Sequence, residues 1–395
     1  MMTVSEAYLD NSATTRPYPE VTRAVAETMA ENYGNPSSLH RKGVAAERAL
    51  TQARERVAAS LNVTGGIIFT GGGTEAINLA LKGLAPGKRG RHVIATSVEH
   101  PAVLNVCEQL RAQGIEVTLL PVNQTGIVDP EQLRAQLRDD TYLVSTIHVN
   151  NEVGAVQPLA DIAAVLADWR RDRRRVFWHV DAVQAYGKLA LRPRELGVDL
   201  LSVSAHKVHG PKGVGALYAA PQTPLRPLLS GGGQEGGLRS GTENVPGIAG
   251  FGVAAALLRR EGVEAAEKMR RLKKQLVEGI LAGAPEAVLN GPPLADGNGN
   301  PDSAPHIANI SFPGLPGEVL VHALEQEGIF VSTGAACSSR KKTGSDVLKA
   351  MGLSAPLLAG AIRFSLAPVN TAAEMDFAVA KTLAVVRELR RLYGQ

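Results

Sequence analysis

The stretch that decides the fold is residues 176–218, which read VFWHVDAVQAYGKLALRPRELGVDLLSVSAHKVHGPKGVGALY. It contains three short runs rich in apolar and β-branched residues, which indicate strands: Val176–Val180, Asp199–Val203 and Gly215–Tyr218. Similar runs lie upstream, separated by amphipathic helical segments such as Pro101–Gln113 and Pro158–Trp169; these runs are Ile67–Thr70, His92–Thr96, Glu116–Val122 and Tyr142–Val149. The alternation predicts an α/β fold with a mainly parallel seven-stranded sheet covered by helices on both faces.

The pattern changes after about Gly250. A long charged helix is predicted there from the apolar face formed by Ala265, Met269, Leu272, Leu276 and Ile280. After a loop rich in Gly, Pro and Asn (290–305), we expect the strands Ile307–Phe312, Ile329–Val331 and Ile362–Leu366, a helix over Glu318–Glu327, and a final helix with Val379, Leu383, Val386 and Leu389 on one face. We therefore predict a large domain over residues 16–256 and a smaller α+β domain formed by residues 1–15 and 257–395.

The composition excludes several classes of protein. The net charge of +4 includes an arginine run at 170–175, but few aromatic residues accompany it, so a solvated helix end is favoured over a nucleic-acid groove. The chain has only 2 cysteines, too few for a disulfide framework. Its first residues do not read as a signal peptide, and the longest uncharged apolar stretch, Gly247–Leu258, is too short to cross a bilayer. A cytoplasmic protein without direct membrane or nucleic-acid contact is predicted.

A glycine turn follows the first strand of the predicted sheet. Ile67–Thr70 leads into Gly71-Gly72-Gly73-Thr74 and then into a helical segment over Ile77–Leu84. A strand, a glycine turn and a helix N-terminus together present unpaired N–H groups and the positive end of the helix dipole, which suits a phosphate. A tight structural turn explains the same pattern equally well, and neither a Walker sequence nor a dinucleotide-binding sequence follows any strand.

Two ionisable residues follow consecutive strands of the quoted stretch. Asp181 ends one strand, and Lys207 follows the next one through Ser204-Ala205-His206. A lysine at this position suits a Schiff base, because burial and cationic neighbours make its amine nucleophilic. The aspartate would pair with a protonated pyridine nitrogen and keep the ring an electron sink. Each residue alone has an ordinary structural explanation; their joint occurrence with the glycine turn indicates a site.

Several motifs, in order along nearly the whole chain, resemble those of one known family, the cysteine desulfurases of the class V aminotransferase group. They are Leu9–Thr15 (LDNSATT), Tyr33–Ser38 (YGNPSS), Glu99-His100, Asn150–Gly154 (NNEVG), Asp181–Gln184 (DAVQ), Ser204–Lys207 (SAHK), Arg239–Thr242 (RSGT) and Ile362–Ser365 (IRFS). The resemblance is to the nitrogen-fixation and iron–sulfur-cluster type. It implies a pyridoxal-phosphate-dependent transferase of fold type I, with the cofactor in the large domain.

The resemblance also implies roles for single residues. Lys207 would carry the pyridoxal 5'-phosphate through an imine, Asp181 would pair with the ring nitrogen, and His100 would stack on the ring and move protons. Gln184 and Asn151 would contact the phenolic oxygen and the substrate, and Arg363 would clamp the substrate carboxylate as a bidentate partner. The phosphate would be held by Gly73, Thr74, Ser204 and His206, with Thr242 reaching in from the second subunit of a homodimer.

Cys337 is predicted to be the sulfur-accepting nucleophile. It lies among small and polar residues, Ser332-Thr333-Gly334-Ala335-Ala336-Cys337-Ser338-Ser339, so an exposed loop is expected. The basic residues Arg340, Lys341 and Lys342 follow and favour the reactive thiolate. Cys107, between apolar residues, is predicted to be an inert buried thiol. No metal site is predicted, apart from a transient cluster-ligand role for Cys337.

The implied reaction converts L-cysteine to L-alanine and leaves sulfur on Cys337 as a persulfide. The acceptor stays open between iron–sulfur scaffold proteins and transfer-RNA thiolation enzymes, and the basic residues after Cys337 would suit an acidic partner. The alternatives are a selenocysteine lyase or another class V aminotransferase-type enzyme, such as a kynureninase-like hydrolase, none of which needs a thiol in a basic loop. A non-catalytic scaffold is disfavoured because it would not need Lys207 and Asp181.

Overall fold

The computed structural model describes residues 4–84, 90–173, 175–294, 301–334 and 344–394. Its main sheet has seven strands in the order β2-β8-β7-β6-β5-β3-β4. They are β2 (Ile67–Thr70), β3 (His92–Thr96), β4 (Glu116–Leu120), β5 (Thr141–Ile147), β6 (Phe177–Asp181), β7 (Leu200–Ser204) and β8 (Gly215–Ala219). Only β8 is antiparallel to its neighbours. The predicted mainly parallel seven-stranded sheet is confirmed, with strand ends that shift by a residue or two.

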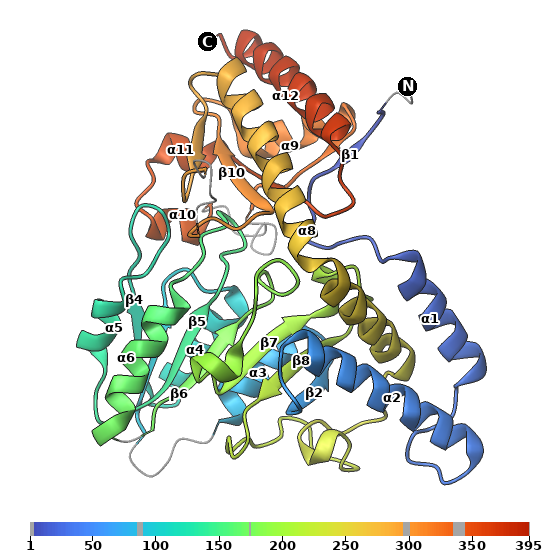
Figure 1. Cartoon of the computed structure of the whole chain (residues 1–395). Helices are drawn as coiled ribbons and strands as arrows, with labels where there is room; N and C mark the ends of the chain where they lie inside the picture. The colour runs from blue at the N-terminus through green and yellow to red at the C-terminus, as the bar shows by residue number, and fades with distance from the viewer. Residues whose placement is uncertain (1–3, 85–89, 174, 295–300, 335–343, 395) are drawn as a thin grey trace.

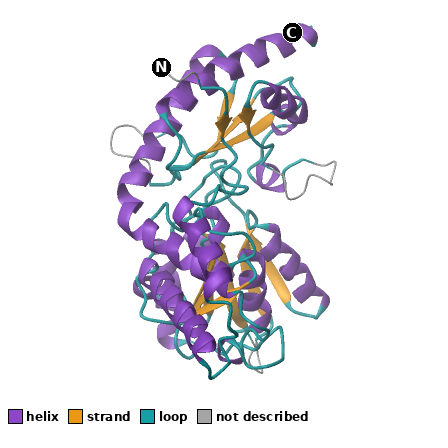
Figure 2. Ribbon diagram, turned by 90° about the vertical axis from the view of Figure 1, so that its right-hand side faces the viewer, coloured by secondary structure: helices purple, strands orange, loops and turns teal. Residues whose placement is uncertain are grey.

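Helices cover both faces of this sheet, as predicted (Figure 1, Figure 2). On β3, Ile94 packs on one face while its neighbours Val93 and Ala95 pack on the other, which is the alternation of a strand buried on both sides. One face carries α3 (Gly73–Gly83) and α4 (Pro101–Ala112). The other carries α2 (Arg41–Ser60), α5 (Pro130–Gln136), α6 (Leu159–Asp172) and the first part of α8 (Val245–Gly283).

A second apolar core surrounds a smaller antiparallel sheet, in the order β12-β10-β9. Its strands are β9 (Val288–Asn290), β10 (Ile307–Ser311) and β12 (Ala361–Ser365). The remaining elements are β1 (Ala7–Tyr8), which pairs in parallel with β11 (Ile329–Phe330), α1 (Pro19–Glu31), α7 (Pro193–Leu196), α9 (Gly317–Gln326), α10 (Asp346–Ala350), α11 (Ala355–Ala359), α12 (Ala372–Leu392), and the 3₁₀ turns η1 (Ala205–Lys207) and η2 (Glu235–Gly237).

One long helix joins the two cores. α8 begins at Val245, some twenty residues before the first residue of the predicted apolar face, so the expected change of pattern near Gly250 falls inside it. Ile248 and Phe251 near its start belong to the core of the large sheet, and Leu276 and Ile280 near its end belong to the core of the small one. Figure 1 shows the same helix running from the lower to the upper half of the molecule. The apolar stretch Gly247–Leu258, which is too short to cross a bilayer, is thus part of the first half of this connecting helix.

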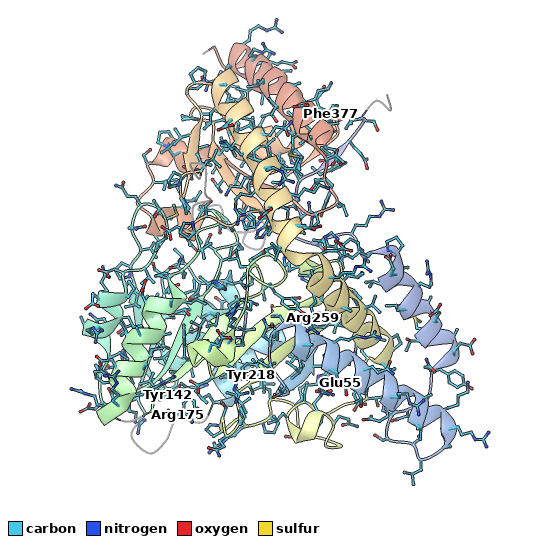
Figure 3. All side chains as sticks on the ribbon, viewed as in Figure 1. Glu55, Tyr142, Arg175, Tyr218, Arg259 and Phe377 are labelled. Carbon is cyan, nitrogen blue, oxygen red and sulfur yellow. The ribbon has the colours of Figure 1, made fainter. Side chains whose placement is uncertain are left out.

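The arginine run lies at the amino-terminal ends of the strands, where its side chains form ion pairs. Arg170 and Arg175 both contact the carboxylate of Asp199, at 2.7 and 2.6 Å. Arg173 pairs with Asp139 at 3.0 Å. Figure 3 labels Arg175 near Tyr142, at the end of the molecule opposite Phe377 on α12. Within the described ranges, no helix has both the length and the apolar character of a membrane span.

Candidate active site

A cavity of about 270 Å³ lies at the carboxyl ends of the central strands. Ile147, Asp181 and Ser204, the last residues of β5, β6 and β7, all line it. Open α/β sheets place ligands at this edge. Apart from Thr242, every predicted site residue that the structure describes lines the cavity: Gly73, Thr74, His100, Asn151, Asp181, Gln184, Ser204, His206, Lys207 and Arg363.

Asp181 is a carboxyl group buried at the floor of the cavity, with 3% of its surface exposed. Its Oδ1 accepts a hydrogen bond of 3.0 Å from the N–H of Val183. Burial raises its pKa to about 6, while that hydrogen bond and the charge of Lys207 act in the opposite direction. A cationic group next to Asp181 would therefore stabilise its charged form, as a protonated ring nitrogen would.

Lys207 ends the 3₁₀ turn that follows β7. Its Nζ donates to the carbonyl oxygens of Ser12 and Ala13, at 2.6 and 2.7 Å. Both carbonyls belong to the N-terminal LDNSATT segment, which the sequence had marked as a motif without assigning it a function. The segment holds the amine of Lys207 at the cavity wall.

The turn after β2 lines one end of the cavity and is suited to an anion. α3 begins at Gly73 and its N-cap is Gly72, whose φ of 151° suits glycine. A Cβ on Gly73 would lie 2.9 Å from Val183 Cγ2, so the backbone approaches the floor closely only because the side chain is missing. The buried hydroxyl of Ser204 finds no hydrogen-bond partner in the described parts of the chain. Helix N–H groups, Thr74 and this hydroxyl suit a phosphate.

His100 and Gln184 line the cavity from fixed positions. His100 Nδ1 caps α4 by accepting from the N–H of Ala102, at 3.1 Å. Burial, helped by the charge of Lys207, lowers the pKa of His100 to about 4, so its imidazole is neutral and Nε2 carries its proton. Gln184 Nε2 donates to the carbonyl of Ser12 at 3.0 Å. Gln184 Oε1 lies 3.4 Å from His306 Nε2. Among the described contacts, His100 Nε2 and the second amide N–H of Gln184 are left for a ligand.

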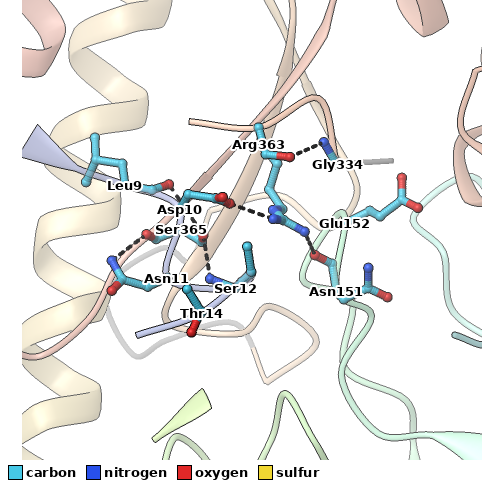
Figure 4. A network of polar contacts seen from close by, with 12 residues as sticks. Leu9, Asp10, Asn11, Ser12, Thr14, Asn151, Glu152, Gly334, Arg363 and Ser365 are labelled. Carbon is cyan, nitrogen blue, oxygen red and sulfur yellow. Dashed lines mark hydrogen bonds and ion pairs between the residues drawn. The ribbon is translucent and has the colours of Figure 1, made fainter. Parts of the chain in front are cut away.

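Arg363 reaches the cavity from β12 of the small sheet and is 3% exposed. Figure 4 shows its guanidinium between Asp10 and Asn151. It pairs with Asp10 Oδ1 at 2.7 Å and donates to the carbonyl of Asn151 at 3.0 Å. Its Nε has no partner in the part of the chain that is described. The planar group is thus held rigidly and suits bidentate binding of a carboxylate. Sequence reasoning missed Asp10, although this acid lies inside a motif that was singled out.

Two predicted residues stand apart from this arrangement. Thr242 is exposed and does not line the cavity of its own chain. Cys337 lies outside the described residues, but Gly334, three positions before it, lines the cavity. Cys107 lies on the buried face of α4 in the apolar core, and burial raises its pKa to about 12. The prediction that Cys107 is an inert thiol agrees with this environment.

Pyridoxal 5'-phosphate fits the residues present. The anion-binding turn, the buried carboxyl of Asp181 and the amine of Lys207 line a single cavity, as the phosphate, the ring nitrogen and the aldehyde of that molecule require. The unsatisfied hydroxyl of Ser204 is the most specific sign, because a buried hydroxyl without a partner is costly unless a ligand supplies one.

Comparisons with known proteins place the chain in a family. The family model described as aminotransferase class-V matches residues 7–377. The cysteine desulfurase IscS of Methanosarcina thermophila is 41% identical over 98% of this chain and 93% of its own length. A solved structure described as a NifS-like protein is 39% identical, with a TM-score of 0.89, over 97% of this chain and all of that one. A second, titled SspA in complex with cysteine, is 33% identical, with a TM-score of 0.79, over 92% of this chain and 99% of that one. The chain therefore belongs to the class-V aminotransferase family, which uses pyridoxal phosphate, and within it to the cysteine desulfurases.

Proposed function

We propose that this chain is a pyridoxal-phosphate-dependent cysteine desulfurase that converts L-cysteine to L-alanine and passes the sulfur to Cys337. The observation that carries the proposal is the single cavity that Lys207, Asp181 and Arg363 line together, with Gly334 at its margin. An amine, an acid and a carboxylate clamp meet there, next to the point where the chain leads to the only other cysteine besides the buried Cys107.

The cofactor would be held at three points of the cavity. Its phosphate would be bound by the N-terminus of α3, Thr74, Ser204 and His206, and its ring nitrogen by Asp181. His100 would lie against the ring, and Gln184 would reach the phenolic oxygen. When bound, the cofactor supplies an electron sink for negative charge at the substrate Cα.

The substrate would be oriented by its carboxylate. Arg363 offers a fixed guanidinium, with Asn151 beside it, and this pairing directs the Cα toward Lys207. The amine of Lys207 takes the proton from Cα and returns a proton later in the reaction. His100, neutral at physiological pH, is suited to move a proton near the substrate sulfur.

Sulfur transfer would then occur between two sulfur atoms. The Cys337 thiolate attacks the substrate sulfur, an S–S bond forms, and the C–S bond of the substrate breaks. The electron pair of that bond stays on the substrate carbon, which takes up a proton to give alanine. The balance is L-cysteine plus the thiol of Cys337 giving L-alanine plus the Cys337 persulfide, so no further oxidant is needed.

Several finer assignments belong to the same proposal. The persulfide would pass to an acceptor protein, either an iron–sulfur scaffold or a transfer-RNA thiolation enzyme, in the cytoplasm. The enzyme would be a homodimer in which Thr242 of one subunit reaches the phosphate of the other; its exposure is compatible with that role. The separate cores around the large and small sheets support a division into residues 16–256 and residues 1–15 with 257–395.

The test is a pair of cysteine variants, Cys337→Ser and, as the matched control, Cys107→Ala. Purified protein loaded with cofactor is mixed with L-cysteine, and alanine is measured together with protein-bound sulfur. We expect Cys337→Ser to lose both products and Cys107→Ala to keep both, because Cys107 is 1% exposed and does not line the cavity. Alanine production at the full rate by Cys337→Ser would contradict the proposal and favour a lyase that releases sulfur without a protein thiol.

A further inference from the structure

A buried carboxylate lies beside the residues that flank the Cys337 segment. Glu152 is only 8% exposed, and the Ser345 hydroxyl donates to its Oε2 at 2.5 Å. On the other side of that segment, a Cβ placed on Gly334 would lie 3.3 Å from the same oxygen, so Gly334 lies close to the carboxylate. Figure 4 shows Glu152 next to Gly334. One side chain therefore bonds to a described residue on one side of the segment and lies close to a described residue on the other.

The backbone of Glu152 is fixed by neighbouring side chains. Asn150 Oδ1 accepts from the N–H groups of Glu152 and Val153, at 2.9 and 3.0 Å. Asn309 Nδ2, from β10 of the small sheet, donates to the carbonyl of Glu152 at 3.2 Å. A carboxylate on a backbone held in this way has little freedom to move, and that makes it a suitable anchor.

The same turn also holds the carboxylate clamp. Arg363 donates to the carbonyl of Asn151, one residue before Glu152. Ser345 in turn caps α10, since its Oγ accepts from the N–H of Leu348 at 3.0 Å. The turn 150–154 thus connects the proposed substrate clamp with both flanks of the Cys337 segment.

Burial of this carboxyl group needs a reason. Burial raises the pKa of Glu152, opposed by the Ser345 hydrogen bond and by the charge of Arg363. Burying an ionisable group with so few partners costs desolvation free energy, and an apolar contact could hold the same two backbone segments together without that cost. Such a group is expected where a fixed geometry matters for function.

We propose that Glu152 is a positioning residue for sulfur transfer: its carboxylate fastens Ser345 and supports Gly334, so that the chain carrying Cys337 starts and ends at fixed points beside Arg363. The role rests on the proposed function, since it presumes that Cys337 takes the sulfur. It acts on the transfer step and leaves cofactor binding unaffected, because Glu152 does not line the cavity.

The experiment compares Glu152→Ala and Ser345→Ala with the control Asp346→Asn. Asp346 is a carboxylate next to Ser345, but its side chain is 69% exposed and pairs only loosely with Lys349. Glu152→Gln is added because its amide oxygen still accepts from Ser345, which keeps the test valid if the alanine variant fails to fold. The first measurement is amide hydrogen exchange at Gly334 and Leu348, which needs neither cofactor nor turnover.

We expect faster exchange at both amides in Glu152→Ala, and wild-type exchange in Asp346→Asn. In Ser345→Ala only Gly334 is informative, because the N–H of Leu348 loses its acceptor there directly. In cofactor-loaded enzyme, kcat for alanine formation falls roughly 10- to 100-fold in Glu152→Ala, as for a misplaced reacting group. The absorbance of the bound cofactor and the KM for cysteine stay near the wild-type values. The variant that combines Glu152→Ala with Ser345→Ala should have the same kcat as Glu152→Ala alone, because both residues act through one contact. In Glu152→Gln we expect kcat to fall less than in Glu152→Ala.

Three results would overturn the inference. Unchanged exchange in Glu152→Ala would show that Glu152 does not hold the two flanks in place. Faster exchange with an unchanged kcat would show that this contact plays no part in sulfur transfer. An equal loss of kcat in Asp346→Asn would show that any substitution in this region lowers activity. If the wild type itself produces no alanine, the proposed function fails, while the exchange data still decide whether Glu152 fastens the two flanks.

Discussion

The two ends of the same strands are built in opposite ways. At the carboxyl ends, Asp181 and Glu99 are buried acids whose pKa values burial raises to about 6 and about 8. At the amino ends, Asp199 is just as buried, but two arginines and the N–H of Trp178 meet its oxygens. A buried charge whose partners are all present is compatible with a stable fold, whereas a buried acid with few partners lowers the stability of the folded state. Substitutions at the first edge should therefore change activity, and those at the second should change stability.

The largest effect is expected for Lys207→Ala at the carboxyl edge. In the proposed function this amine carries both the covalent link to the cofactor and the proton, so its removal should lower kcat by ~10⁴-fold or more. The free energy of unfolding should change by only about 1 kcal/mol. Steady-state kinetics and urea unfolding measure the two quantities.

The matched control is Lys212→Ala, an exposed lysine a few residues further on. It should leave both quantities unchanged. If Lys207→Ala retained even a tenth of the wild-type rate, the carboxyl edge would not be the reactive one.

A conservative change at Arg363 should give the next largest effect. Arg363→Lys keeps the charge and the contact with Asp10 but loses the planar fork, so kcat/KM for cysteine should fall about 100-fold, chiefly through KM. The same exchange at the other edge, Arg175→Lys, should leave the kinetics unchanged because that guanidinium pairs with Asp199 and lies over the ring of Phe177, and neither residue lines the cavity. Equal kinetic losses in both variants would remove the distinction between the two edges.

At the amino edge, Asp199→Asn should affect stability alone. Two arginines lose their shared carboxylate, and since both stay partly exposed we expect a loss of roughly 2–3 kcal/mol in the free energy of unfolding. Asp139→Asn is the control, because its side chain is 87% exposed and its pair with Arg173 should contribute less than about 0.5 kcal/mol. A drop in kcat without a loss of stability in Asp199→Asn would reverse our assignment of this edge.

The smallest effect is expected for Glu99→Gln at low pH, and it changes with pH. Near pH 4, where Glu99 carries its proton in the folded and largely in the unfolded chain, the amide should cost about 1 kcal/mol or less. The folded state keeps a proton that the unfolded chain loses above about pH 4.3, so wild-type stability falls as the pH rises toward 8. Glu99→Gln has no ionisable group at this position, so its stability lacks this dependence on pH.

The difference in unfolding free energy should thus move in favour of Glu99→Gln from pH 5 to pH 8 and become constant above that. Urea unfolding at several pH values measures it. A difference that stays the same from pH 5 to pH 9 would show that Glu99 is already ionised in the folded protein.

The strands could be predicted from the sequence because each is a continuous apolar run that ends at a polar residue, as Val180 does before Asp181. The full extent of α8 could not, since its apolar face changes partner midway, from the core around Phe251 to the core around Ile280. That Asp181 and Lys207 would line one cavity was predictable because they follow neighbouring strands. The contacts of Lys207 with Ser12 and Ala13 were not, because they join positions nearly 200 residues apart through backbone carbonyls, which carry no sequence signal.

The most direct test of the central claim is to locate the lysine that carries the cofactor. Borohydride reduction of the loaded protein fixes pyridoxal phosphate to its lysine, and peptide mass spectrometry then identifies the position. The account predicts modification of Lys207 alone. Stable modification of Lys188 or Lys212 in its place, or none on a protein that still forms alanine from cysteine, would contradict it.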